Sequence, residues 1–218
     1  MEPAGWTGVF RHGRDLYTRN PTPGRKVYGE ELRTESGVEY RRWDPFRSKL
    51  AAYLLRSRPG PLLESVRSVL YLGGAHGTTV SHLSDALPDA TIFAVEKSPS
   101  SFAPLLGLAR ERTNLLPLLV DAQLPERYAA DVGRVDLLYQ DVAQRGQARI
   151  FAENAHACLA HSGRGLLMLK IRSVTQARSS AAVVAEARQI LEKARLPVRD
   201  SVDLAPFSRE HVAFRIGA

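Results

Sequence analysis

The chain has 218 residues, of which 44% are hydrophobic and 24% charged, and it carries a formal net charge of +7. This length is enough for one main core, the apolar runs are too short to span a bilayer, and the N-terminus lacks a secretion signal. The lone Cys158 excludes an internal disulfide, so we expect a cytoplasmic protein. The positive charge favours a polyanionic partner without identifying it.

Residues 1–45 show no helical periodicity and contain turn signals at 20–24 and 35–37. Segments at 8–11 and 26–30 have the pattern of short strands, which predicts a small β-rich N-terminal region. Arginines and aromatic residues are interleaved along this part of the chain. That arrangement fits a surface that faces nucleic acid, but scattered arginines are more often simply solvated, and both interpretations stay open.

The remainder, residues 46–218, begins with a helical pattern and then alternates strands with helices. The expected strands cover 67–72, 91–95, 115–120, 134–139, 164–170, 198–204 and 211–216, and the expected helices cover 77–87, 99–112, 146–160 and 178–195. The segment between the last two strands is too short for a crossover helix, so these strands should pair antiparallel at a sheet edge. The pattern predicts an α/β, Rossmann-like methyltransferase domain of class I type, with a seven-stranded, mostly parallel sheet.

The stretch 69–87 combines a predicted buried strand, a tight turn containing Gly73, Ala75 and Gly77, and the start of a helix. Small residues let the backbone approach a ligand, and the N–H groups that open a helix bind anionic atoms. Glu96 ends the next strand, where a carboxylate suits the two hydroxyls of a ribose. The spacing from Gly73 to Gly77 differs from the dinucleotide fingerprint and matches the looser pattern of S-adenosylmethionine-dependent methyltransferases. A tight turn without any ligand remains the alternative.

Further polar residues end other predicted strands at the same edge of the sheet. Asp121 could reach an adenine amino group, although an ordinary loop aspartate is the alternative. Asp141 and Lys170 end the next two strands, and a lysine beside a carboxylate can orient a hydroxyl nucleophile or accept its proton. A solvent-exposed salt bridge is the other interpretation of this pair. Lysine is much the rarer basic residue in this chain, so its presence at position 170 favours the catalytic interpretation.

Several blocks of the sequence resemble the fibrillarin family, the RNA 2′-O-methyltransferases of box C/D guide ribonucleoproteins. The blocks occupy residues 26–30, 39–52, 71–73, 77–82, 94–96, 121–122, 141–144 and 154–156. The most specific are Tyr-Arg-Arg-Trp-Asp-Pro-Phe-Arg-Ser-Lys at 40–49 and Asp-Val-Ala-Gln at 141–144. The chain has no long Gly/Arg-rich N-terminal tail, so the compact archaeal type is expected.

The resemblance implies a catalytic tetrad at Lys49, Asp141, Lys170 and His211. Without the resemblance, the chemistry and sequence position of the residues would not identify Lys49 or His211. It implies S-adenosylmethionine contacts at Thr78, Thr79, Glu96, Lys97, Asp121, Ala122, Asp141, Val142, Ala143 and Gln144, in addition to the turn of Gly73, Ala75 and Gly77. It also implies guide-directed methylation of rRNA or tRNA. The implied partners are a box C/D guide RNA, a Nop-domain scaffold protein and a kink-turn-binding protein of ribosomal type.

Some positions depart from the family pattern. Lys97 stands where an aromatic residue often stacks on the adenine, Gln140 replaces a small residue before Asp141, and Ile171-Arg172 follow Lys170 in place of an alanine-type continuation. Two other functions stay open at this point. Methylation of a protein or small molecule would need a deep apolar acceptor pocket, and non-catalytic RNA binding would not need two lysines and two acids at one crevice.

Overall fold

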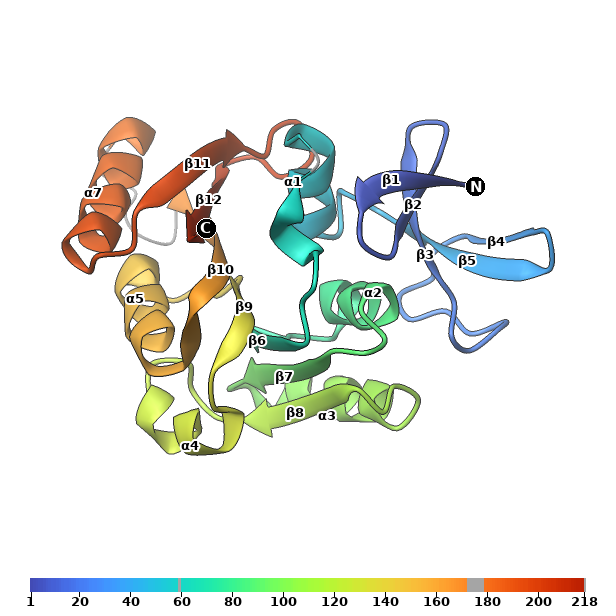
Figure 1. Cartoon of the computed structure of the whole chain (residues 1–218), viewed down its shortest axis with the longest axis horizontal. Helices are drawn as coiled ribbons and strands as arrows, with labels where there is room; N and C mark the ends of the chain where they lie inside the picture. Colours follow the sequence, from blue (N-terminus) through green and yellow to red (C-terminus); the bar gives the residue numbers. More distant parts are fainter. Residues whose placement is uncertain (59, 172–178, 218) are drawn as a thin grey trace.

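The computed structural model describes residues 1–58, 60–171 and 179–217, which form two β-sheets with helices around them (Figure 1). The smaller sheet comes first in the chain and the larger one follows, in agreement with the predicted order of a β-rich region and an α/β sheet. Among the described residues, no helix is both long and apolar enough to cross a membrane.

The N-terminal sheet is antiparallel throughout and has the strand order β1-β2-β3-β5-β4. Its strands are β1 (Glu2–Trp6), β2 (Val9–His12), β3 (Asp15–Arg19), β4 (Leu32–Glu35) and β5 (Val38–Trp43). Ser36 and Gly37 both have positive φ and form the two-residue turn between β4 and β5. Such turns match the twist of a hairpin. The strand predicted near 8–11 is therefore present as β2.

The prediction of a strand at 26–30 is wrong. The backbone of this segment is hydrogen-bonded by side chains and not by a neighbouring strand. The Glu30 carboxylate accepts the N–H groups of Val27 and Tyr28 at 2.8 to 3.1 Å. The Tyr28 hydroxyl lies 2.8 Å from Nε2 of His82, a buried residue of helix α2 (Thr78–Ala86). The segment is consequently a loop attached to α2.

The larger sheet has the strand order β11-β12-β10-β9-β6-β7-β8. Its strands are β6 (Ser68–Leu72), β7 (Thr91–Glu96), β8 (Leu115–Leu119), β9 (Val135–Gln140), β10 (Leu159–Lys170), β11 (Val198–Asp203) and β12 (His211–Gly217). The five strands from β10 to β8 are parallel, and β12 is antiparallel to both of its neighbours. The predicted seven-stranded sheet with a hairpin at one edge is confirmed.

Helices cover both faces of this sheet (Figure 1). They are α1 (Lys49–Arg56), α2, α3 (Pro99–Ala109), the short α4 (Ala129–Val132), α5 (Gln147–Cys158) and α7 (Ser180–Lys193), with 3-10 turns η1 (Pro61–Leu63) and η2 (Pro125–Arg127). Residue 178, the predicted start of the last helix, lies outside the described residues. Val69 and Tyr71 of β6 pack in the cluster that contains α1 and α2, whereas Leu70 and Leu72 pack with α5 and α7. Because alternate residues of a strand face opposite sides, a sheet covered on both faces has nearly continuous apolar strands.

The N-terminal sheet shares a core with the side of the larger sheet that carries α1 and α2. Trp6 and Trp43 are buried in the same cluster as residues of both helices. The buried Arg41 of β5 pairs with Glu30 at 2.6 Å and with Asp85 of α2. Because a buried charge is tolerated only when it is paired, this network fixes α2 against the N-terminal sheet.

Candidate active site

The turn after β6 brings three strand ends of the larger sheet together. The N–H groups of Gly73 and Gly74 both donate to the Val95 carbonyl, at 2.9 and 3.0 Å, which joins the ends of β6 and β7. Gly73 has a φ of +90°, and a Cβ there would collide with the carbonyl oxygen of Asp141, which follows β9. Only glycine combines this backbone conformation with such a close approach.

Glu96 is held at this turn by backbone groups. Its Oε2 accepts the N–H of Ala75 and its Oε1 accepts the N–H of Ser98, both at 2.8 Å. Ala75 has a positive φ of 45°, which is uncommon for a residue with a Cβ. Each carboxylate oxygen has a second acceptor position, so Glu96 keeps the capacity to bind two hydroxyl donors.

Asp121 follows β8 and is held by neighbouring side chains. Gln144 Nε2 lies 2.9 and 3.2 Å from its two oxygens, and Lys97 Nζ lies 3.5 Å from Oδ2. Burial acts to raise the pKa of Asp121, but hydrogen bonds from the Gln123 N–H and from Gln144, together with Lys97, outweigh it and lower that pKa overall. Asp121 is therefore charged at neutral pH, with Lys97 as its ion-pair partner.

A cavity of about 380 Å³ lies between these strand ends. It is lined by Gly73, Ala75, Val95, Glu96, Lys97, Val120, Ala122, Asp141, Val142, Ala143 and Gln144. This volume is in the range of small-molecule sites. Sequence reasoning missed Val95 and Val120. Each directly precedes a predicted acid at a strand end, and that position is the signal that could have identified them.

Four predicted cofactor residues lie outside the lining of this cavity. Gly77 caps helix α2 and Thr78 and Thr79 begin it, while Asp121 lies next to the lining residues Val120 and Ala122. The Thr79 hydroxyl is buried and donates to Ser48 Oγ at 3.0 Å. In this structure Thr79 therefore supports the start of α1.

Lys49 and Asp141 form an ion pair beside the cavity. Lys49 is the first residue of α1, whose N-cap Ser48 accepts the N–H of Ala51. Its Nζ lies 2.7 Å from Asp141 Oδ2. The Asp141 N–H donates to the Leu72 carbonyl at 2.9 Å, so the end of β6 sets its position. The two side chains are 25% and 19% exposed, which leaves the pair accessible to a substrate.

His211 lies opposite Lys170 in the register of β12 and β10. Its Nδ1 lies 2.9 Å from the Arg209 carbonyl, so we assign the ring proton to Nδ1. Its Nε2 is buried and has no hydrogen-bond partner among the described residues. Burial lowers the pKa of His211, and the ammonium groups of Lys49 and Lys170 lower it further. The Arg209 carbonyl and Asp141 oppose this shift without cancelling it. The imidazole is consequently neutral at neutral pH.

Two glutamines join the strand ends that carry Asp141 and Lys170. Gln147, the first residue of α5, accepts the Lys170 N–H at 2.9 Å and donates to the Lys170 carbonyl at 3.1 Å. Gln140, the last residue of β9, donates from its side chain to the Gln147 carbonyl at 2.8 Å. These bonds fix the end of β10 relative to the loop that begins with Asp141.

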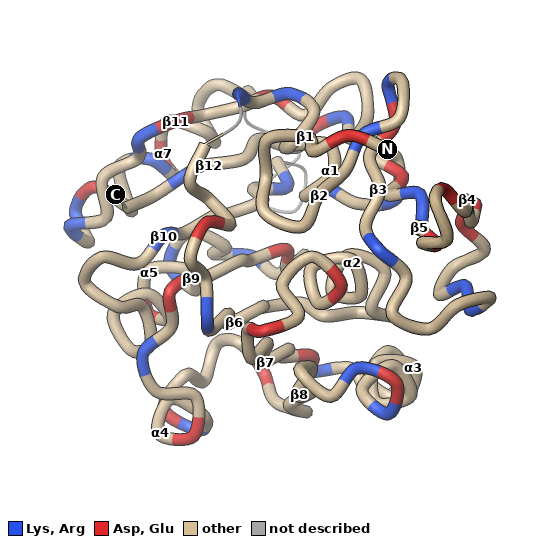
Figure 2. The backbone as a smooth tube through the Cα atoms, turned by 45° about the vertical axis from the view of Figure 1, so that its right-hand side comes forward, with Lys and Arg blue, Asp and Glu red and all other residues tan. Residues whose placement is uncertain are grey.

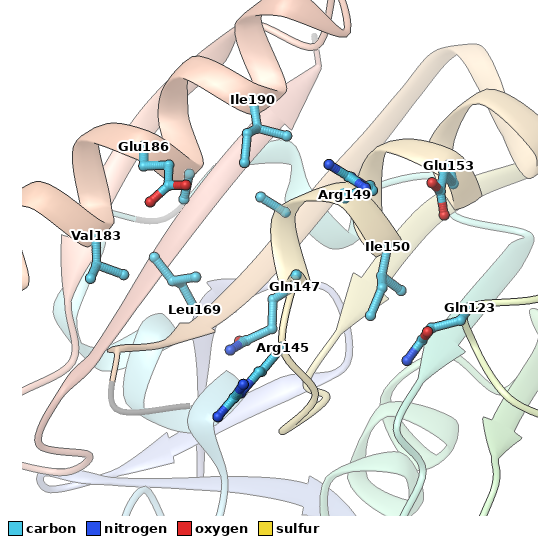
Figure 3. A pocket seen from close by; sticks show the side chains of 13 residues that line it. Gln123, Arg145, Gln147, Arg149, Ile150, Glu153, Leu169, Val183, Glu186 and Ile190 are labelled. Atoms are coloured by element: carbon cyan, nitrogen blue, oxygen red, sulfur yellow. The ribbon is translucent and has the colours of Figure 1, made fainter. Parts of the chain in front are cut away.

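In the sequence, Gln140 was noted only as a departure from the family pattern, and Gln147 was not identified. Both side chains are fully buried, and a buried amide without partners would cost free energy. For Gln140 the available signal was an amide at the end of a largely buried strand; Gln147 gave no such signal. Figure 3 shows Gln147 between Leu169 and Ile150, at a hollow of about 630 Å³ that α5 and α7 line. None of the strand-end acids lines that hollow.

Comparison with known proteins relates this architecture to one family. The family model for fibrillarin matches residues 3–217. The chain is 44% identical over 212 residues to the fibrillarin-like rRNA/tRNA 2′-O-methyltransferase of Methanothermobacter thermautotrophicus, covering 97% of this chain and 95% of that protein. Aeropyrum pernix fibrillarin, solved in complex with natively bound S-adenosyl-L-methionine, has a TM-score of 0.85 and 42% identity, covering 93% and 88% of the two chains. A fibrillarin/Nop5p complex gives a TM-score of 0.87 and 36% identity, covering 100% and 99%.

The strand order and the position of the site at the carboxyl edge of the sheet define a class I S-adenosylmethionine-dependent methyltransferase fold. The match over nearly the whole chain decides the family within that class. The chain belongs to the fibrillarin family, and the resemblance seen in the sequence blocks is confirmed.

Proposed function

We propose that this protein is an RNA 2′-O-methyltransferase that transfers a methyl group from S-adenosylmethionine to ribose 2′-hydroxyls of rRNA or tRNA. The observation that carries the proposal is the 2.7 Å ion pair of Lys49 and Asp141, next to a cavity of about 380 Å³ that contains Glu96. A paired acid at this position supports the proposal, because an acceptor hydroxyl next to the cavity would meet both the acid and the cofactor. The Methanothermobacter relative is named for the same reaction.

The groups around the cavity fit the cofactor. The free acceptor positions of Glu96 suit the two ribose hydroxyls, the charged Asp121 suits the adenine amino group, and Gly73 allows close approach of the backbone. Lys97 offers an aliphatic stem at the position where the family pattern implies an aromatic ring. When bound, the cofactor supplies an electrophilic methyl group on its sulfonium sulfur.

The chain's own residues then position the acceptor. Asp141 accepts a hydrogen bond from the 2′-hydroxyl, and Lys49 holds that carboxylate in place. Lys170 polarises the same oxygen, and His211 completes the polar network with the free Nε2 of its neutral ring. The oxygen gains the methyl group and loses its proton to this network. Because methyl transfer from a sulfonium needs little covalent assistance, orientation of the hydroxyl is most of the catalytic task.

Site selection by a box C/D guide RNA, with a Nop-domain scaffold protein and a kink-turn-binding protein, is the second part of the proposal. Lys and Arg positions are spread along the chain rather than gathered in one segment (Figure 2). Such positions contact phosphates, which orient an RNA without reading its sequence. Base pairing with a guide would supply the missing specificity. A solved fibrillarin relative forms a complex with Nop5p.

Two expectations from the sequence stay predictions. One is the division of the chain into a β-rich region at 1–45 and a methyltransferase domain at 46–218. The other is the cytoplasmic location of an archaeal-type protein, which agrees with its proposed RNA substrates.

Reconstitution tests both parts of the proposal. The chain, labelled cofactor and target RNA would be combined with and without guide RNA and the two partner proteins, and the product mapped for 2′-O-methyl groups. Methylation at one defined nucleotide should need guide and partners, and should move when the guide is re-addressed. Efficient, site-specific methylation by the chain alone would contradict the guide-directed part. Absence of 2′-O-methyl product in every combination would contradict the activity itself.

A further inference from the structure

Phe46 is the most exposed of the large hydrophobic side chains that the structure describes, with 67% of its surface accessible. It lies in the turn before α1. Its ring meets the ring of Phe207 edge to face, with centroids 5.3 Å apart and an interplanar angle of 72°. Phe207, in the loop between β11 and β12, is half-buried against the main core. One ring is therefore anchored and the other presents its surface to solvent.

Each ring belongs to a segment that carries a residue of the proposed tetrad. Phe46 precedes Lys49 by three residues, which limits the distance between their Cα atoms to about 11 Å. Phe207 precedes His211 by four residues, which limits that distance to about 15 Å. Both segments are also held locally: the Phe46 N–H donates to Asp44 Oδ1 at 2.9 Å, and the Phe207 N–H donates to the Leu204 carbonyl at 3.0 Å.

The chemistry around the rings favours RNA. Arg47 and Arg209, next to the two phenylalanines in sequence, are exposed. The exposed ring of Phe46, in segments that also carry two arginines, matches a nucleotide, whose base and ribose present apolar faces and whose phosphates are anionic. The Arg47 guanidinium itself lies over the Tyr28 ring, 5.3 Å from its centroid. An exposed aromatic ring could also bind a protein partner. The position favours RNA, because an RNA strand must pass beside Lys49 and His211 for its ribose to reach these residues.

We infer that Phe46 and Phe207 form a contact site for a nucleoside of the RNA substrate, a few nucleotides from the one that is methylated. The inference rests on the proposed RNA methyltransferase function and specifies where its substrate binds. Successive nucleotides in a stacked strand rise about 3.4 Å. The distance limits therefore place the contacted nucleoside within about four nucleotides of the methylated ribose.

Steady-state kinetics of the reconstituted complex give the first test. Phe46→Ala should raise the KM for target RNA about tenfold, the scale of losing one base–aromatic contact. Phe46→Tyr should restore the wild-type value because it keeps the ring. The matched control is Leu106→Ala, which removes an exposed apolar side chain from helix α3. Calorimetry on the free chain should show the same cofactor affinity for all three variants. An unchanged KM in Phe46→Ala would overturn the inference.

A crosslinking experiment reports contact without requiring turnover. Phe46 would be replaced by the photoreactive amino acid p-benzoylphenylalanine, and the complex irradiated with target and guide RNA present. Crosslinks should map to RNA within about four nucleotides of the target ribose. Crosslinks to partner proteins alone would overturn the inference in favour of a protein-docking role, and so would the absence of RNA crosslinks. A wild-type complex without methyltransferase activity would count against the proposed function, while the crosslink would still decide whether this surface contacts RNA.

Discussion

The cofactor half and the catalytic half of this active site are assembled over different distances along the chain. In the cofactor half, Glu96 binds the N–H of Ala75, 21 residues away, and both belong to consecutive β–α units. In the catalytic half, Lys49 reaches Asp141 across 92 residues, and His211 arrives on a strand that runs antiparallel to the strand of Lys170.

This difference has a physical origin. Successive parallel strands deliver their carboxyl ends to one edge of the sheet by topology alone, so a turn and an acid in neighbouring units meet automatically. Lys49 lies on a helix whose position depends on the packing of the N-terminal sheet and of α2. The cofactor half should therefore tolerate changes in the catalytic half, and the two halves should be separable by mutation.

The largest expected effect is in the catalytic half. Lys170→Ala should lower methyl transfer about 100-fold or more, the scale of a positioned acid–base group, because the acceptor hydroxyl loses its polarising partner. Lys170 does not line the cofactor cavity, so calorimetry should show unchanged S-adenosylmethionine binding. Single-turnover rates with labelled cofactor measure the effect. A fully active Lys170→Arg enzyme would refute the requirement for an amine at this position.

A change in the cofactor half should weaken cofactor binding and leave the rate of methyl transfer at saturating cofactor nearly unchanged. Glu96→Ala should weaken cofactor binding about tenfold or more, because the ribose hydroxyls lose a charged acceptor and the loss of even one such bond costs about 1.5–3 kcal/mol. At saturating cofactor the turnover number should stay near that of the wild type. Titration calorimetry measures the affinity, with the exposed Glu126→Ala as control. Equal cofactor binding by Glu96→Ala would remove Glu96 from the site.

The smallest expected effect comes from Gln147, the glutamine that holds the Lys170 backbone within the catalytic half. Gln147→Leu removes both bonds to the Lys170 backbone and should lower the turnover number several-fold while leaving the KM for cofactor unchanged. The free energy of unfolding should fall by about 1–3 kcal/mol, since the partly buried N–H and C=O of Lys170 lose their partner. Chemical denaturation measures the stability, with Gln189→Leu on the exposed face of α7 as the control for the same chemical change. A loss of stability without any change in turnover would make Gln147 purely structural.

Much of the fold could be predicted from the sequence, and the errors concentrate in one region. The parallel strands β6, β7 and β8 of the larger sheet were predictable because each is a short, mostly apolar run bounded by turn residues. The N-terminal sheet was harder: its strands are half-exposed and short, and most were anticipated only as a β-rich region. The segment 26–30 looked like a strand, but its pairing partner is the carboxylate of Glu30, and strand propensity contains no information about that contact.

The sequence by itself determined the α/β class, the turn at Gly73 and the strand-end acids Glu96, Asp121 and Asp141, because alternation of elements and strand-end position are local patterns. Residue physics did not select Lys49 or His211; only the family resemblance placed them in the site. Tertiary structure alone decided that the Lys49 ammonium pairs with Asp141 and that burial lowers the pKa of His211. It also decided that Gln147 holds the Lys170 backbone. Each of these features depends on burial and on contacts between segments that are distant in the sequence. The spacing of residues along a chain predicts neither of them.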